Sequence, residues 1–214
     1  MKVARHSILI LFILWHSAGA QPVERGKFHT SDLVELVKLD STIKLDIRYA
    51  TSNNFMKRKM YTQGRAFLQR PAAEALVRAN EKLKRDGYGI LVFDGYRPWS
   101  VTKDFWDKTP SSKRKFVANP KEGSKHNRAC AVDCSLYDLK TGSEVKMPSP
   151  YDDFTGKASS NYSGGTDEQR RTRSILRNAL EAERFTVNPD EWWHFDYKDW
   201  RQYRVMDVPF EKLR

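Results

Sequence analysis

The sequence predicts a single domain of the α+β class. Segments with the period of a helix and segments with the period of a strand both occur, but they lack the regular strand–helix–strand order of a parallel sheet. The chain has 214 residues, of which 39% are hydrophobic and 30% charged, which is enough apolar material for one packed core. It has no internal repeat and no linker rich in Pro, Gly or Ser. A repeat array, a disulfide-dense mini-scaffold and a multi-span membrane protein are therefore excluded.

The first long feature of the chain is an apolar run over residues 8–15. It follows a basic start and ends at the small residues Ala18-Gly19-Ala20. This pattern predicts a secretory signal peptide over 1–20, because the run is too short to span a bilayer comfortably. The remaining 21–214 is then a secreted or periplasmic domain with no stable membrane insertion after cleavage. An uncleaved membrane anchor is the alternative interpretation.

Strand and helix patterns alternate in the first half of that domain. Residues 43–49 alternate apolar and polar side chains, which predicts a half-buried strand. A helix is expected over Pro71–Asp86, with Pro at its first position and Gly87 just after its end. A buried strand is expected over Gly89–Phe93, where the sequence reads G-I-L-V-F.

The second half predicts more of both element types, joined by longer polar loops. The patterns predict, in chain order, a short helix over 100–106, a strand over 131–136, a helix over 166–184 with an apolar inner face, and a strand over 192–197. The intervening segments 108–124 and 148–165 are polar or rich in Ser, Gly and Asp, and are expected to be loops.

Charge and cysteine content point to no particular partner. The net charge is +11, and it falls to +9 for residues 21–214 when the two basic residues of segment 1–20 are removed. Lys and Arg are spread along the chain without an arginine-rich tract. We therefore expect a solvated basic surface and no binding of nucleic acid. Cys130 and Cys134 would lie about 13 Å apart on an extended strand, beyond disulfide range. We expect two packed thiols.

The histidines are the clearest indication of chemistry. Asp133 lies seven residues after His126, and Glu191 lies three residues before His194. Two imidazoles and one carboxylate can hold zinc with a fourth position open for water, and a further carboxylate can act as its general base. For either pair alone, a hydrogen-bonded histidine and a surface acid are the simpler explanation; both pairs together favour a metal site.

The spacing of these pairs sets two structural requirements. His126 and Asp133 are an odd number of residues apart, so a bend near Ala129 is needed to bring them to one face. Glu191 and His194 would share a face across a helical turn, which Pro189 and the residue after it could begin.

Four blocks of this sequence have the spacing of recognisable short motifs. Residues 124–133 match S-x-H-x6-D, and 191–194 match E-x-W-H. Residues 46–55 resemble D-x-[RK]-Y-A-T-x-x-N-F, and 94–98 read D-G-Y-R-P. These blocks resemble motifs of the D-alanyl-D-alanine dipeptidases of the M15 zinc peptidase family, and they occur in the family's order over most of 21–214. The resemblance implies a Hedgehog/D,D-peptidase-like fold, with a small, mostly antiparallel sheet flanked by helices.

The resemblance also implies roles for individual residues. His126, Asp133 and His194 would bind one Zn2+ per chain. Glu191 would be the general base acting on the zinc-bound water, and Arg97 would stabilise the tetrahedral intermediate, since a guanidinium stays charged and offers several donors.

Three further residues are implied to bind substrate. Tyr49 and Asp152 would hold the substrate ammonium, and Ser124 would help to fix the substrate. Simpler explanations exist for three of the implied site residues: Tyr49 could belong to the core, and Arg97 could be a structural partner of Asp94. Asp152 could equally be a solvated turn residue.

The sequence departs from the family pattern at two positions. Ala129 stands where a glycine is usual, which costs about 1–2 kcal/mol if the backbone there has positive φ. Pro148 replaces a second glycine and could shift Asp152. Both changes bear on substrate fit more than on zinc.

The expected function is zinc-dependent hydrolysis of D-Ala-D-Ala to two D-alanines. A small pocket partly closed by the stretch 99–125 would admit this dipeptide and refuse longer peptides. A cell-wall D,D-carboxypeptidase or endopeptidase acting on peptidoglycan stem peptides is the first alternative. A non-catalytic, zinc-stabilised wall-binding module is the second, and the presence of Glu191 argues against it.

Overall fold

The computed structural model describes residues 20–213. The signal peptide expected over 1–20 therefore lies outside the described residues, apart from its last position. Within the described part of the chain, no helix is long and apolar enough to cross a membrane.

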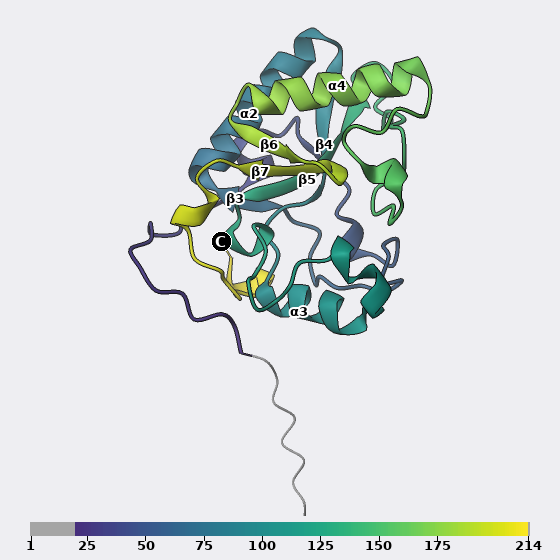
Figure 1. The fold of residues 1–214 in the computed structure, drawn as a ribbon. Helices are drawn as coiled ribbons and strands as arrows, with labels where there is room; N and C mark the ends of the chain where they lie inside the picture. The colour runs from purple at the N-terminus through teal and green to yellow at the C-terminus, as the bar shows by residue number, and fades with distance from the viewer. Residues whose placement is uncertain (1–19, 214) are drawn as a thin grey trace, which may run out of the picture.

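A five-stranded mixed sheet forms the centre of the molecule (Figure 1). Its strands lie in the order β2 (Lys44–Leu45), β4 (Tyr88–Asp94), β5 (Ala131–Asp138), β7 (Glu191–Tyr197) and β6 (Phe185–Asn188). All neighbouring strands in it are antiparallel except β2 and β4. Strands β1 (Leu33–Glu35) and β3 (Phe67–Gln69) form a separate antiparallel pair. The α+β class and the mostly antiparallel sheet are confirmed.

Two long helices cover one face of this sheet. Helix α2 (Arg70–Arg85) and helix α4 (Asp167–Glu181) lie side by side above the strands in Figure 1. Each presents a buried apolar stripe, and α4 begins with a reciprocal capping box between Thr166 and Gln169. The short helix α1 (Leu36–Leu39) leads from β1 toward β2. Helix α3 (Trp99–Lys108) and the longer loops lie on the other side of the sheet (Figure 1).

The expected strand over 43–49 is wrong beyond its first residues. Only Lys44 and Leu45 pair with β4; the chain then turns into the 3-10 helix η1 (Arg48–Ala50), where the Ala50 N–H donates to the Ile47 carbonyl. The alternating burial was still informative, because Ile47 and Tyr49 are both buried. Alternation identified the inward side chains, but a segment at the edge of the sheet kept only two ladder pairs.

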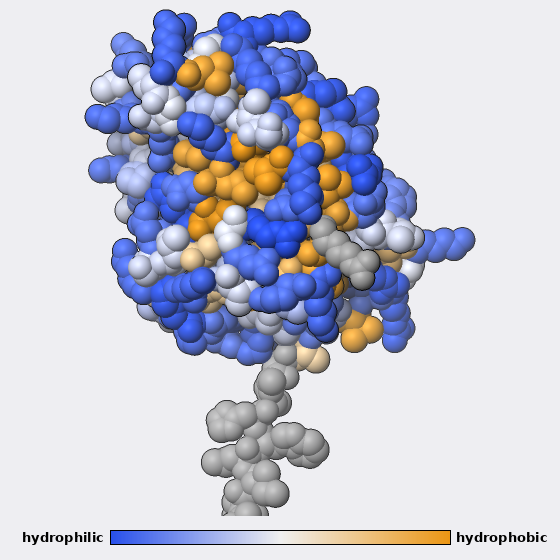
Figure 2. Space-filling model, turned by 180° about the vertical axis from the view of Figure 1, so that it is seen from behind, coloured by the Kyte–Doolittle hydropathy of each residue, from blue (hydrophilic) through white to orange (hydrophobic). Residues whose placement is uncertain are grey.

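The remaining expected elements are present, with ends that differ by at most three residues. Cys130 and Cys134 are free and buried, as expected for packed thiols. Strands β1, β3 and β6 had no clear pattern in the sequence, since each has only three or four residues. In the view from behind, hydrophilic residues occupy most of the outline and hydrophobic residues gather toward the middle (Figure 2).

Candidate active site

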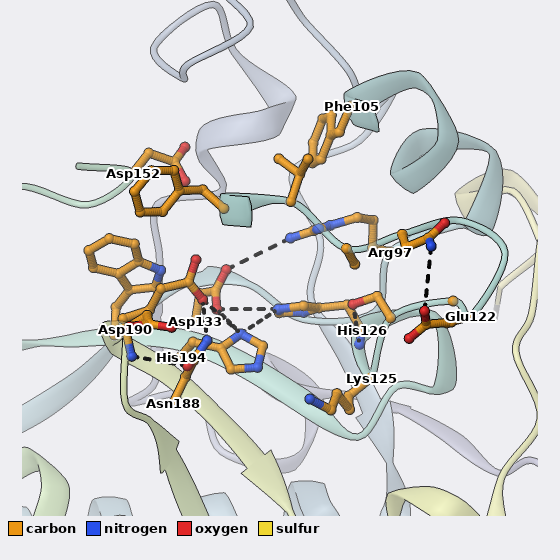
Figure 3. A pocket seen from close by; sticks show the side chains of 18 of the residues that line it. Arg97, Phe105, Glu122, Lys125, His126, Asp133, Asp152, Asn188, Asp190 and His194 are labelled. Carbon is orange, nitrogen blue, oxygen red and sulfur yellow. Dashed lines mark hydrogen bonds and ion pairs between the residues drawn. The ribbon is translucent and has the colours of Figure 1, made fainter. Parts of the chain in front are cut away.

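Two neighbouring strands place the first two of the expected metal ligands side by side. Asp133 in β5 is directly opposite His194 in β7, and the Asp133 Oδ1 to His194 Nδ1 distance is 2.9 Å. His126 approaches from the 3-10 helix η3 (His126–Arg128) just before β5. Its Nε2 lies 3.2 Å from Asp133 Oδ1 and 3.1 Å from His194 Nδ1 (Figure 3). All three side chains are buried, and three ligand atoms converge on one point.

A left-handed residue supplies the bend that the odd spacing required. Ala129 ends η3 with φ 54° and ψ 34° and turns the chain into β5. The Ser124 hydroxyl accepts a hydrogen bond from the His126 N–H at 3.2 Å, which holds the start of this turn. The expected bend near Ala129 is confirmed, and so is the positive φ at a position where glycine is usual.

The far nitrogen of each imidazole is held by an acceptor. His126 Nδ1 lies 2.7 Å from the Gly95 carbonyl, and His194 Nε2 lies 2.8 Å from Asp196 Oδ1. Because both acceptors take an N–H, the proton of each neutral ring is fixed there, and the other nitrogen offers its lone pair to the centre. Two imidazole nitrogens and one carboxylate oxygen are a donor set that fits zinc with an open position.

The electrostatics of the trio favour added positive charge. Burial raises the pKa of Asp133, but His126 and His194 outweigh it and hold that pKa well below its usual value. Burial lowers the pKa of His194, yet hydrogen bonds to Asp133 and Asp196 overcome this and raise it to about 10. A site that stabilises a proton this strongly also favours a divalent cation in its place.

Glu191 reaches the trio from a strand, so the expected helical turn is wrong. It is the first residue of β7, where the register against β6 shifts between Val187 and Asn188. This irregularity brings its carboxylate within 3.9 Å of His194 Nδ1, although residues three apart on a regular strand face opposite sides. Asn188 Nδ2 donates to Glu191 Oε2 at 2.8 Å, and burial raises the pKa of Glu191.

Arg97 combines the structural pairing with a position beside the trio. Its Nε and Nη2 donate to Asp94 Oδ2 at 3.0 and 2.7 Å, and its Nη2 lies 3.9 Å from Asp133 Oδ2. The guanidinium also lies over the rings of Tyr49 and Phe105, with its carbon 5.3 and 4.9 Å from their centroids. Its charge is thus held in place by an acid and two aromatic faces.

Tyr49 and Asp152 meet at another wall of the site. The Tyr49 hydroxyl, from η1 and not from a strand, donates to the two Asp152 carboxylate oxygens at 3.1 and 3.2 Å. Burial and the nearby charge of Asp133 raise the pKa of Asp152 to about 8. Asp152 also has positive φ, 59°, within the loop that begins at Pro148. An ammonium group there would find a carboxylate in poorly solvated surroundings.

One cavity of about 500 Å³ joins these groups. It is lined by all eight residues expected in the site: Tyr49, Arg97, Ser124, His126, Asp133, Asp152, Glu191 and His194. The stretch 115–119 and the aromatic rings of Phe105, Phe116 and Phe154 line other parts of its wall, and Phe116 stacks on Phe154. Residues of the polar stretch 99–125 therefore contribute to the cavity wall, as expected.

Three residues that hold the site were missed in the sequence. Asp196 accepts from His194, Asn188 donates to Glu191, and the Tyr151 hydroxyl donates to Asp133 Oδ2 at 2.9 Å. Asp196 could have been found, because positions 194 and 196 face the same side of a strand. Asn188 and Tyr151 carry no such spacing, since each depends on how a loop or an irregular register returns to the sheet.

A buried His–Asp–His trio with an adjacent carboxylate and guanidinium in one cavity defines a metal-dependent hydrolase of the α+β class. Comparison with known families makes this specific. Residues 29–211 match the peptidase M15 family described as D-Ala-D-Ala dipeptidase. The chain belongs to this family.

Individual relatives agree with the family match. The chain is 30% identical over 178 residues to a D-alanyl-D-alanine dipeptidase of Enterococcus faecium, covering 73% of this chain and 87% of the relative. It is 24% identical over 181 residues to the D-alanyl-D-alanine dipeptidase of Escherichia coli, covering 85% of this chain and 92% of the relative.

The solved structures compared are more distant. The vancomycin-resistance D,D-dipeptidase VanXYg, solved with a D-Ala-D-Ala phosphinate analogue, is 21% identical with a TM-score of 0.44. The match covers 64% of this chain and 52% of that one. The family assignment depends on the sequence matches alone.

Proposed function

We propose that the protein is a zinc-dependent dipeptidase that hydrolyses D-Ala-D-Ala to two D-alanines. The observation that carries the proposal is the convergence of His126, Asp133 and His194 beside Glu191 in a cavity that is also lined by a candidate for ammonium binding, Asp152. Membership of the dipeptidase family supports the same reaction.

The ligands of the trio, Glu191 and Arg97 have different roles in hydrolysis. Zinc held by His126, Asp133 and His194 would polarise the scissile carbonyl and make water a stronger acid. Glu191 takes the proton of the attacking water and passes it to the leaving amine, and its raised pKa brings it closer to the working pH for that exchange. Arg97 places a fixed positive charge near the oxygen that becomes negative.

The opposite wall selects a free dipeptide. Asp152, with Tyr49 hydrogen-bonded to it, pairs with the substrate ammonium, and burial strengthens that pairing. A stem peptide has an amide in place of the ammonium, so it leaves the Asp152 carboxylate without a cation and needs room for the rest of the chain. Ser124 lines the same cavity, and its hydroxyl proton remains able to donate to substrate.

The protein acts outside the cytoplasm in this proposal. The basic start and apolar run of segment 1–20 support export to the periplasm or beyond. There the enzyme would meet dipeptide released from peptidoglycan, which favours a role in wall turnover or nutrition over removal of a cytoplasmic precursor.

The test is D-alanine release from D-Ala-D-Ala by the purified chain 21–214, with and without a chelator, and by Glu191→Ala. Turnover that both chelation and the substitution abolish is the expected result. A folded, zinc-loaded protein that leaves the dipeptide intact would contradict the proposal. Release of D-alanine from intact stem peptides but not from the dipeptide would support the wall carboxypeptidase instead.

A further inference from the structure

A row of four side chains leads outward from the metal trio along β7 and the turn before η3. His194 Nε2 donates to Asp196 Oδ1 at 2.8 Å. The other Asp196 oxygen lies 3.2 Å from Lys125 Nζ, which lies 5.5 Å from the centre of the Trp200 ring. Asp196 is mostly buried, with 19% of its side chain exposed, whereas Lys125 is 40% exposed. The row therefore runs from the buried site to the surface.

The two imidazoles of the trio are held by different kinds of acceptor. His126 donates to the neutral Gly95 carbonyl, whereas His194 donates to a carboxylate. A carboxylate acceptor fixes the ring orientation. It also makes the opposite ring nitrogen a stronger electron-pair donor to a metal ion. Because Asp196 is two residues after His194 on the same strand, the backbone sets the distance between them.

Lys125 pairs with the Asp196 carboxylate. A carboxylate as buried as Asp196 is costly unless it is paired. The ammonium of Lys125 balances its charge and occupies the oxygen that His194 does not use. The face of Trp200 lies near the same ammonium, and a cation next to an aromatic face is favourable. Lys125 thus helps to hold the Asp196 carboxylate in the orientation that faces His194.

We propose that Asp196 is a positioning residue that holds His194 in its metal-binding orientation and tautomer, and that Lys125 holds Asp196 in turn. The inference rests on the zinc site of the proposed function. It adds to that site an outer carboxylate and a lysine partner that set metal affinity.

The experiment measures zinc affinity by competition with a colorimetric chelator for the wild type and four variants of the chain 21–214. Asp196→Ala is expected to bind zinc about 10- to 100-fold more weakly. Asp196→Asn should lie between the two, since its amide oxygen can accept the same N–H without a charge. Lys125→Met should lose less than Asp196→Ala. Asp199→Asn is the matched control, because this acid on the same segment pairs with Lys198 and should leave affinity unchanged.

A spectroscopic measurement separates positioning from general damage to the fold. In the cobalt-substituted protein, Asp196→Ala should shift the visible absorption bands, because the donor strength of His194 changes while the ligand set does not. Far-UV circular dichroism should stay that of the wild type. If Asp196→Ala does not fold, Asp196→Asn decides by the same two measurements.

Two results would overturn the inference: a folded Asp196→Ala or Asp196→Asn protein with zinc affinity within about twofold of the wild type, against the loss expected for an outer-shell partner, or an equal loss in Asp199→Asn. In those cases a wild type that binds zinc and cleaves dipeptide leaves the proposed function standing. A wild type that binds no zinc would overturn both proposals.

Discussion

The two sides of the cavity are built differently. On the metal side, Asp133 and His194 are paired positions of neighbouring strands, and His126 follows from the turn that enters one of them. On the substrate side, Tyr49 and Asp152 come from a 3-10 turn and a loop 103 residues apart, and the Tyr49 hydroxyl is the group that links them.

The difference follows from what each side must do. A metal site tolerates errors of only about a few tenths of an ångström in ligand position. Its ligands therefore benefit from the fixed register of a sheet and from hydrogen-bond partners on their outer atoms. Substrate recognition is more easily carried by loops, which can differ between relatives while the sheet stays the same. Replacing a metal ligand should therefore abolish activity, and replacing a side chain that binds substrate should alter selectivity.

Removing a ligand should have the largest effect and tests the metal side directly. His126→Ala should reduce dipeptide hydrolysis to background, because two remaining ligands do not hold zinc in a fixed geometry. A chelator should do the same to the wild type, and added zinc should restore only the latter. Zinc content by atomic absorption and D-alanine release are the measurements. Full activity after exhaustive chelation would remove the metal from the reaction.

Glu191→Gln should have the next largest effect, and it separates chemistry from metal binding. The amide keeps the size of the side chain but cannot accept the proton of water, so kcat should fall about 10²- to 10⁴-fold. Zinc affinity should stay close to that of the wild type, since Glu191 is not one of the three converging ligands. Steady-state kinetics alongside zinc titration measures both. A large loss of zinc with the activity would instead make Glu191 a ligand.

Asp152→Asn tests the substrate side. Loss of one charge-assisted contact should lower kcat/KM for D-Ala-D-Ala about 10- to 100-fold, with zinc affinity unchanged. An N-acetylated dipeptide, which has no ammonium, should discriminate far less between the wild type and the variant. If the variant loses activity equally on both substrates, Asp152 does not bind the ammonium.

The pH dependence gives Asp152 a second signature. Burial and Asp133 raise its pKa to about 8, so the carboxylate ionises, and binds an ammonium, as pH rises toward that value. Zinc would offset the charge of Asp133, so the range over which kcat/KM rises with pH should lie at or below pH 8. Above about pH 8 the dipeptide amine loses its own proton and kcat/KM falls again. In Asp152→Asn the rise due to Asp152 should disappear from the profile of kcat/KM against pH.

The same contrast decides how much of the site could be predicted from the sequence. The ligands of the metal side lie in short motifs, so residue types and spacing were enough to pick out His126 and His194 as ligand candidates. The position of Glu191 was expected on a helical turn, but it depends on a register shift between β6 and β7 that no local pattern reports. Tyr151 was missed for a related reason, because its contact with Asp133 depends on the path of a loop.

The smallest expected effect concerns the joint between η3 and β5, where the metal side has a strained residue. Ala129 is fully buried with φ 54°, a conformation that costs a non-glycine residue about 1–2 kcal/mol. Ala129→Gly removes that strain, but glycine costs about 0.5–1 kcal/mol in conformational entropy. It also gives up a buried methyl worth about 0.8 kcal/mol. These contributions nearly cancel.

The free energy of unfolding of Ala129→Gly should therefore differ from that of the wild type by less than about 1 kcal/mol in urea denaturation. Zinc affinity should not change, since the backbone turn that aligns His126 with Asp133 is kept. A loss of more than about 2 kcal/mol would show that packing of the methyl group outweighs the backbone strain. A loss of zinc affinity at unchanged stability would instead show that the alanine methyl, and not the left-handed backbone, keeps His126 facing Asp133.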